Sequence, residues 1–369
     1  MWRNLYYIAR GSLVDYLQIR RPPQMLQLPI TNRCNSRCVT CNVWKNNKDL
    51  KDLDPLKLKD VFANPFFSHV SSVGLNGGEL TLYKDFDILL EAVFTLPNLK
   101  FVSLISNGLL PEKLFEILRR NYPLFKKRGI SLAITLSIDG VGDVQNNVRG
   151  IKTAWDRSRK AIEYIISHKS DLCDVVNVGC TISKYNVFNM PEVDYYLSNL
   201  NIPVEYHLAV PNKRIGTFEN SDYSVLTSDR SRLMALEFFY KKYVDPSETR
   251  EKKMRYFMQM EYLKTKGNIR LASCSFKYKD ITIDENLNVY LCATASDTFG
   301  SLVENDPNSL FKTEEYKTVV NMVRSQCKSC VHYIWYPSLY GIVYFFRDRL
   351  FKRICYYIFK IKLWSISLL

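Results

Sequence analysis

Three cysteines near the start of the chain, Cys34, Cys38 and Cys41, fall within eight residues. They follow directly after residues 25–31, an apolar run that predicts a β-strand. A compact loop with three thiolates can bind three of the four irons of a 4Fe-4S cube, because thiolates are soft ligands that suit iron. The fourth iron would keep an open position for a small chelating molecule. The alternatives are a zinc site whose fourth ligand lies elsewhere and a chance cluster.

A second group of cysteines lies in the C-terminal half of the chain. Its members are Cys274, Cys292, Cys327 and Cys330. The first two flank a predicted hairpin formed by residues 281–283 and 289–291, and the last two form a Cys-x2-Cys knuckle. Four thiols make a closed tetrahedral site, which suits structural zinc or a fully ligated 4Fe-4S cluster. The spacing does not choose between these two.

Six apolar, β-branched runs occur before residue 211, and a polar or helical stretch follows each of them. The runs are residues 25–31, 69–75, 101–105, 131–138, 175–182 and 204–210. Strands that alternate with helices favour parallel βαβ units with right-handed crossovers. We therefore expect an α/β fold, a partial (β/α)6 TIM-like barrel, followed by a small α+β cysteine-rich domain. In such barrels, functional groups gather at the C-terminal ends of the strands.

Candidate motifs follow the first four predicted strands. They are Cys34, Gly77-Gly78-Glu79, Asn107-Gly108 and Asp139-Gly140. Each has an ordinary explanation by itself: a glycine turn, an acid at a helix N-terminus or a common turn dipeptide. Arg149, taken alone, is best explained as a solvated surface residue. Their recurrence at successive strand ends predicts one shared site.

The sequence resembles the radical S-adenosylmethionine (SAM) enzymes over roughly residues 25–210. The first three cysteines match the Cys-x3-Cys-x2-Cys signature of that family. The other matching segments are Gly77-Gly78-Glu79 for the family's Gly-Gly-Glu, Ile105-Ser106-Asn107-Gly108 for its Thr-Asn-Gly turn, and Ser137-Ile138-Asp139-Gly140 with Arg149-Gly150 for its Ser-x-Asp-Gly and Arg-Gly. The ordered set of four motifs is far more specific than any single one.

The resemblance implies a SAM-binding 4Fe-4S cluster on Cys34, Cys38 and Cys41. It also implies that the glycine-rich strand edge binds the methionine amino group, that the serine lies near the ribose, and that the arginine pairs with the carboxylate. The residues expected to bind SAM are Gly77, Gly78, Glu79, Asn107, Ser137, Asp139 and Arg149. Thr40 stands where the family often has an aromatic residue, so Trp44 is the candidate for packing against adenine. Leu80 stands where a proline often follows Gly-Gly-Glu.

The second cysteine group is similar to the shortened auxiliary-cluster domain called twitch. One auxiliary 4Fe-4S cluster is the most that we expect, because the longer SPASM domain adds cysteines and only Cys355 lies beyond Cys330. Leu287 stands where a glycine is usual in that turn. Cys173, Cys180 and Cys355 are assigned to structure, with acylation of Cys355 as the alternative if its helix lies on a membrane. The expected boundaries are 1–24 for a basic N-terminal segment, 25–225 for the barrel, 226–335 for the helical connection with the cysteine-rich domain, and 336–369 for a basic aromatic helix.

The expected reaction is reductive cleavage of SAM to a 5′-deoxyadenosyl radical, which then abstracts hydrogen from a substrate C–H bond. Oxidation, epimerisation or cross-linking could follow, and the sequence identifies no further catalytic residue. The expected substrate is a sugar, a glycan or a lipid-linked glycan, with peptide or tRNA modification as the alternative. Residues 1–24 are too few for a peptide-recognition domain, which lowers the peptide alternative. A low-potential flavodoxin or ferredoxin is the expected electron donor.

The chain of 369 residues carries a formal net charge of +14, which favours anionic partners. Its basic aromatic ends predict helices that lie on an anionic membrane surface or that pack under the barrel. No segment reaches the ~20 uninterrupted apolar residues that span a bilayer. Few, clustered cysteines and the lack of a secretory signal predict a reducing, cytoplasmic location, with the inner membrane face as a peripheral alternative.

A non-enzymatic protein that holds zinc at both cysteine groups and binds nucleic acid is the rival class. Against it, no basic run interleaved with aromatic residues occurs within the barrel, and the chain has only four histidines. Nucleic acid is therefore not an expected partner.

Overall fold

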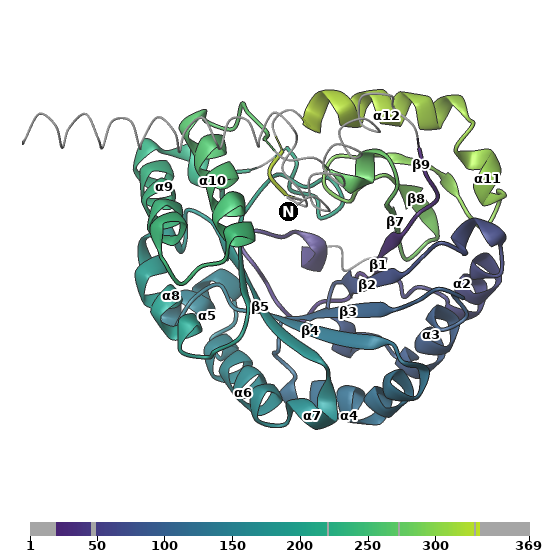
Figure 1. The fold of residues 1–369 in the computed structure, drawn as a ribbon, viewed down its shortest axis with the longest axis horizontal. Helices are drawn as coiled ribbons and strands as arrows, with labels where there is room; N and C mark the ends of the chain where they lie inside the picture. Colours follow the sequence, from purple (N-terminus) through teal and green to yellow (C-terminus); the bar gives the residue numbers. More distant parts are fainter. Residues whose placement is uncertain (1–19, 46–48, 220, 272–273, 328–329, 333–369) are drawn as a thin grey trace, which may run out of the picture.

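Six parallel strands form the centre of the fold in the computed structural model, which describes residues 20–45, 49–219, 221–271, 274–327 and 330–332 (Figure 1). The strands are β1 (Met25–Thr31), β2 (Ser72–Gly77), β3 (Phe101–Ser106), β4 (Ser131–Ser137), β5 (Val175–Ile182) and β6 (Val204–Leu208). Neighbours in the chain are neighbours in the sheet, and every pair among them is parallel. This confirms the predicted α/β partial barrel.

Helices alternate with these strands and lie around the outside of the curved sheet (Figure 1). They are α2 (Pro55–Phe62), α3 (Phe86–Val93), α4 (Pro111–Arg128), α5 (Asp143–Arg149), α6 (Ala154–Ser167), α7 (Lys169–Leu172) and α8 (Met190–Ser198). Later in the chain come α9 (Asp229–Val244), α10 (Arg250–Lys264), α11 (Pro307–Leu310) and α12 (Glu314–Gln326). Short 3-10 helices are η1 (Val43–Lys45), η2 (Pro65–Phe67), η3 (Leu80–Leu82), η4 (Val187–Asn189), η5 (Val225–Thr227) and η6 (Ser275–Lys277).

The predicted C-terminal hairpin continues the same sheet. β7 (Ile281–Ile283) pairs in parallel with β1, and β8 (Asn288–Tyr290) and β9 (Thr298–Ser301) follow in antiparallel pairing. The strand order is therefore β6-β5-β4-β3-β2-β1-β7-β8-β9. Leu287, in the turn between β7 and β8, has a φ of 61°. Glycine adopts this left-handed region most easily, so the turn has the conformation that the usual glycine would suit.

Several predicted strand ends differ from the structure by one to three residues, and the largest difference is at the start of β2. β2 begins at Ser72 rather than at residue 69, because the turn at the end of η2 continues and the Val70 N–H donates to the Phe67 carbonyl. The apolar spacing of α2 predicts that Leu56 shares a buried face with Leu58 and Phe62, but Leu56 is 65% exposed while the other two are buried. Leu56 is two positions before Leu58, so on a helix with 3.6 residues per turn it faces nearly the opposite side.

The apolar faces of α3 and α4 belong to the buried core. Phe86, Leu89, Leu90 and Val93 of α3 are buried, as are Leu114 and Leu118 of α4. Each such side chain contributes about 1.5–3 kcal/mol by leaving water. Within the described residues, no helix combines the length and apolarity needed to cross a bilayer. The predicted terminal segments, apart from residues 20–24, and Cys355 lie outside the described residues.

Candidate active site

The loop that carries the first three cysteines begins where β1 ends and docks against the C-terminal end of α5. The Arg37 N–H donates to the Arg149 carbonyl over 2.8 Å, and the Val39 N–H donates to the Val148 carbonyl over 3.0 Å. Three thiols that lie far from α5 in sequence are thus fixed against it by backbone hydrogen bonds.

The glycine pair after β2 allows the chain to pass close to the segment that leads into this loop. A Cβ atom on Gly78 would lie 1.9 Å from the Arg33 carbonyl oxygen. The Gly78 N–H donates to the Thr31 carbonyl over 2.6 Å. Gly77 has a φ of 134°, which L side chains rarely adopt. Both glycines are therefore required for packing, whatever else they bind.

Glu79 joins the ends of β2 and β3. Its carboxylate is buried and accepts hydrogen bonds from the Ser106 hydroxyl at 2.7 Å, the Thr81 hydroxyl at 2.9 Å and the Asn107 N–H at 2.8 Å. Burial raises the pKa of Glu79, and these donors oppose that effect. The Asn107 amide in turn donates to Asn35 over 2.8 Å and lies 3.9 Å from the Cys34 sulfur. Glu79 thus positions Asn107 beside the cysteine loop.

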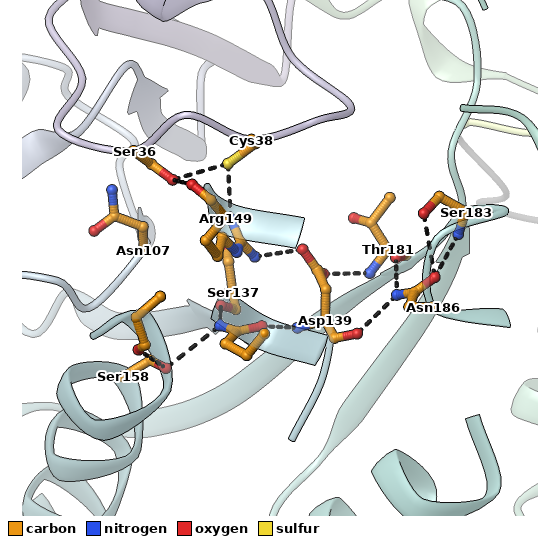
Figure 2. Close-up of polar contacts among 12 residues, drawn as sticks. Ser36, Cys38, Asn107, Ser137, Asp139, Arg149, Ser158, Thr181, Ser183 and Asn186 are labelled. Carbon is orange, nitrogen blue, oxygen red and sulfur yellow. Dashed lines mark hydrogen bonds and ion pairs between the residues drawn. The ribbon is translucent and has the colours of Figure 1, made fainter. Parts of the chain in front are cut away.

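Asp139 and Arg149 form a buried ion pair at the end of β4. Asp139 Oδ2 and Arg149 Nη2 are 2.7 Å apart, and Arg149 Nη1 lies 3.6 Å from the Cys38 sulfur (Figure 2). The Thr181 N–H donates to Asp139 over 2.7 Å. Burial lowers the pKa of Arg149, but the adjacent Asp139 carboxylate outweighs burial and raises it. The guanidinium is therefore a fixed positive charge beside the cysteine loop.

The backbone around Asp139 is held from two sides (Figure 2). Gln145 accepts from the Asp139 N–H over 2.8 Å and donates to the Ser137 carbonyl over 3.2 Å. The Asn186 amide donates to the Asp139 carbonyl over 2.7 Å. This turn is rigid, which fits a segment that must present Ser137 at a constant place.

Trp44 lies on the other side of the cysteine loop. Its indole N–H donates to the Cys38 carbonyl over 3.3 Å, and the Arg37 guanidinium lies 5.3 Å from the ring centre. Its neighbours Thr40 and Cys41 line the large cavity described next. The adenine-packing role of Trp44 stays a prediction.

A cavity of about 690 Å³ opens beside the strand ends. Cys41, Gly77 and Ser137 line it on the side of the first cysteine group, and Cys292 lines it as part of the second. The volume lies within the range of about 300–1,000 Å³ that is typical of ligand sites. One cavity therefore touches both cysteine groups.

The sequence alone did not predict most of the residues that line the cavity from α10. This helix presents Lys252, Arg255, Tyr256 and Gln259 to the cavity, at the spacing of one helix face. Arg255 Nη1 lies 2.6 Å from Glu205 Oε2 of β6. The available signal was the spacing of Lys252, Arg255 and Gln259 along one face of α10.

Several buried polar atoms in this wall have no hydrogen-bond partner. They are Gln259 Oε1, Thr282 Oγ1 and Thr294 Oγ1, and their residues are at most 5% exposed. A buried polar atom without a partner costs about 1–3 kcal/mol. These atoms fit a bound polar molecule that would supply the missing hydrogen bonds.

The structure brings the second cysteine group together around Arg270. Ionised thiols at Cys274, Cys292, Cys327 and Cys330 would all raise the pKa of the buried Arg270 against the effect of burial. The Arg270 guanidinium also donates to the Cys330 carbonyl over 2.6 Å. Burial raises the pKa of Cys327 to about 12 and that of Cys292 to about 11.

Residues 210–217, which we call the bridging loop, connect the two cysteine groups. The Asn42 N–H, next to Cys41, donates to the Ile215 carbonyl over 3.1 Å. The Lys213 N–H donates to the Thr294 carbonyl over 2.9 Å, close to Cys292. The bridging loop therefore fixes the separation of the two groups.

The residues present fit the iron–sulfur cluster and the SAM that the motifs imply. Burial raises the pKa of Cys34 to about 12 and that of Cys41 to about 11, so iron would have to displace their protons. In the described part of the chain, no three Cys, His, Asp or Glu side chains converge on one metal ion. A 4Fe-4S cube needs no such convergence, since each thiolate binds a different iron. Arg149 Nε is buried without a partner and could donate to a bound carboxylate.

Comparison with known proteins identifies the domain. Residues 28–184 match the Radical SAM superfamily. The chain is 31% identical over 137 residues to GTP 3′,8-cyclase of Mannheimia succiniciproducens, covering 36% of this chain and 38% of that protein. It is 30% identical over 162 residues to molybdenum cofactor biosynthesis protein moc-5 of Caenorhabditis elegans, covering 42% of this chain and 25% of that protein. The chain thus aligns with well under half of these two relatives.

The fold is similar to that of solved structures at low sequence identity. anSMEcpe with bound AdoMet has a TM-score of 0.58 and 18% identity, covering 84% of this chain and 86% of that one. Streptococcus suis SuiB bound to S-adenosylmethionine has a TM-score of 0.55 and 16% identity, covering 85% and 71%. The fold and the cysteine loop define a radical SAM domain. Residues 28–184 are a radical SAM domain, and this match supports an enzyme rather than the alternative of a non-enzymatic zinc protein.

Proposed function

We propose that the chain binds a 4Fe-4S cluster through Cys34, Cys38 and Cys41, binds SAM in the adjoining part of the cavity, and abstracts hydrogen from a substrate in the remainder. The observation that carries this proposal is the single cavity that Cys41, Gly77 and Ser137 all line. When bound, the cluster and SAM supply a 5′-deoxyadenosyl radical.

The chain's own residues would hold and orient these groups. Gly77, at the end of β2, lines the part of the cavity where the methionine amino group would bind, and Ser137 lies at the cavity wall. The partnerless Arg149 Nε supports its contact with the methionine carboxylate. The Glu79 and Asp139 carboxylates are each bound by protein donors, so we assign them the positioning of Asn107 and Arg149.

A polar substrate suits the remaining wall of the cavity. Gln27, Asn76, Thr135 and Thr181 project into it from four strands. The charged side chains there are paired, as Arg255 with Glu205 and Arg214 with Glu285 at 3.0 Å. Amides, hydroxyls and paired charges together support a sugar or glycan, which is rich in hydroxyl groups. A nucleotide is the second candidate, because relatives are named GTP 3′,8-cyclase. Peptide or tRNA modification stays a further alternative.

The second cysteine group would hold one auxiliary 4Fe-4S cluster. Its four cysteines lie near enough to the buried Arg270 to act on the pKa of that residue. Cys292 also lines the cavity. A closed zinc site is the alternative. We further propose a low-potential flavodoxin or ferredoxin as the electron donor and a reducing cytoplasmic location. The basic ends of the chain would contact an anionic membrane.

Anaerobic reconstitution followed by iron and sulfide counts tests the proposal. We expect about eight irons in the wild type and about four in Cys34→Ala/Cys38→Ala/Cys41→Ala. Dithionite and SAM should give 5′-deoxyadenosine with the wild type alone. Cys173→Ala, at a buried free cysteine in the core, is the matched control and should keep all the iron. Zinc at both groups with no nucleoside would overturn the proposal, and four irons would leave the second group as zinc or empty.

Deuterated candidates then test the substrate. Transfer of deuterium from a deuterated sugar, sugar nucleotide or GTP into 5′-deoxyadenosine identifies the class that supplies the hydrogen. Transfer from GTP but from no sugar would replace the glycan proposal with the nucleotide one.

A further inference from the structure

We propose that Arg149 positions the cysteine loop and sets the reduction potential of the first cluster through Cys38. This inference rests on the proposed function, since it concerns the cluster on the first cysteine group. It gives Arg149 a role that is separate from any contact with SAM.

The positioning part follows from the backbone. The Arg149 carbonyl accepts from the Arg37 N–H at 2.8 Å and from the Ser36 hydroxyl at 3.0 Å. A Cβ atom on Gly150 would lie 2.5 Å from the Arg37 carbonyl oxygen, so the loop and the end of α5 are in direct contact. Two ligands of the cluster lie on either side of this contact, at Cys34 and Cys38. The end of α5 therefore determines where the loop presents its sulfurs.

The electrostatic part follows from the side chain. Arg149 Nη1 lies 3.6 Å from the Cys38 sulfur, and Nη2 is fixed by Asp139 at 2.7 Å (Figure 2). The Ser36 hydroxyl also lies 3.0 Å from that sulfur, but its one proton is shared with the Arg149 carbonyl. The Cys34 sulfur has neutral neighbours, the Asn107 amide at 3.9 Å and the Ser36 backbone N–H. Arg149 and Arg214 also act electrostatically on Cys41, but among the described residues Cys38 is the ligand whose sulfur lies within hydrogen-bond reach of a cation.

Charge beside a cluster sulfur changes the reduction potential. Reduction adds one electron, so a nearby cation stabilises the reduced cluster and makes the potential less negative. Asp139 partly cancels that cation because its carboxylate is 2.7 Å away. Removing Arg149 and removing the charge of Asp139 should therefore shift the potential in opposite directions. A purely structural role would not produce opposite signs.

The test is a redox titration of the reconstituted full-length protein, followed by electron paramagnetic resonance without SAM. The signal to follow is the one that Cys34→Ala/Cys38→Ala/Cys41→Ala lacks. Arg149→Gln should give a more negative midpoint potential than the wild type, and Asp139→Asn a less negative one. Asn can still accept from the Thr181 N–H at this position. Arg159→Gln, on the exposed face of α6 beside Glu163, is the control and should leave the potential unchanged.

Arg149→Lys keeps the proposal testable if Arg149→Gln fails to bind iron. Lys retains the charge, so its potential should stay nearer to the wild type, and Asp139→Asn tests the sign independently. The proposal would be overturned if the midpoint potentials of the Arg149 and Asp139 variants shifted in the same direction. It would also be overturned if the potential shifted neither in Asp139→Asn nor in the Arg149 variant that binds iron. A wild type that carries no cluster on the first cysteine group would contradict the proposed function itself. A cluster that ignores both substitutions would contradict only the role of Arg149.

Discussion

Asp139 Oδ2 and Arg149 Nη2 lie 2.7 Å apart in an ion pair whose side chains are 4% and 9% exposed. The pair connects the end of β4 with the end of α5 and, through Arg149, with Cys38. Partners in such pairs depend strongly on each other, because removal of one leaves an uncompensated buried charge.

Asp139→Ala should destabilise the folded protein strongly. It leaves the Arg149 cation buried without its counter-ion, which typically costs about 3–5 kcal/mol. Denaturant unfolding of the apoprotein measures the difference. Glu163→Ala removes the carboxylate of an exposed pair with Arg159 and should change stability little. Equal losses in the two variants would contradict the importance of burial.

Gly78→Ala should disturb the entry into the cysteine loop. Its methyl group would lie 1.9 Å from the Arg33 carbonyl oxygen, so the backbone of one segment must move. We expect lower stability and less iron bound by the first cysteine group. Gly129→Ala is the control, because nothing lies within 4 Å of its added methyl group. That control should lose some stability from its positive φ of 65° and keep its iron.

Glu79→Gln should weaken the junction of β2 and β3. Both carboxylate oxygens of Glu79 accept hydrogen bonds, one from the Ser106 hydroxyl and the other from the Asn107 N–H. In the Gln variant, one oxygen is replaced by an NH2 group, which would face one of these donors. The expected loss is about 1–3 kcal/mol in the free energy of unfolding. Unfolding in urea, with iron content measured in parallel, checks it. Unchanged stability would mean that Glu79 is not hydrogen-bonded as described.

Thr282→Val should be neutral or stabilising by about 1 kcal/mol in the protein without substrate, because it removes a buried hydroxyl that has no partner. Thr81→Val is the matched comparison, since the Thr81 hydroxyl donates to Glu79 over 2.9 Å. That variant should be destabilising. The opposite order of the two melting temperatures would show that the Thr282 hydroxyl is already satisfied.

Much of the fold follows from local sequence pattern. The β5 strand, Val175–Ile182, agrees with prediction at both ends, because an apolar β-branched run has a period that neighbouring residues alone determine. Cys34, Cys38 and Cys41 could be recognised for the same reason, since their spacing is a local property. The predicted site residues at the ends of β2, β3 and β4 are also brought near the cysteine loop.

What could not be predicted depends on contacts between distant segments. The pairing of Arg149 with Cys38 joins residues that are 111 positions apart, and no local pattern specifies it. The polar face of α10 could be recognised as unusual, but its place in the cavity wall depends on how the chain returns after β6. The parallel pairing of β7 with β1 is of the same kind.

That last pairing has a consequence for how the chain avoids self-association. Without β7, β1 would be the edge of a parallel sheet, with Leu26, Leu28 and Ile30 next to a row of unpaired backbone groups. Such an edge is a template for another chain's strand. The C-terminal hairpin covers it, and the short strands β8 and β9 become the new border. The region that carries the second cysteine group therefore also protects the sheet from aggregation. A chain cut before Ile281 would leave the edge of β1 open to strands of other chains.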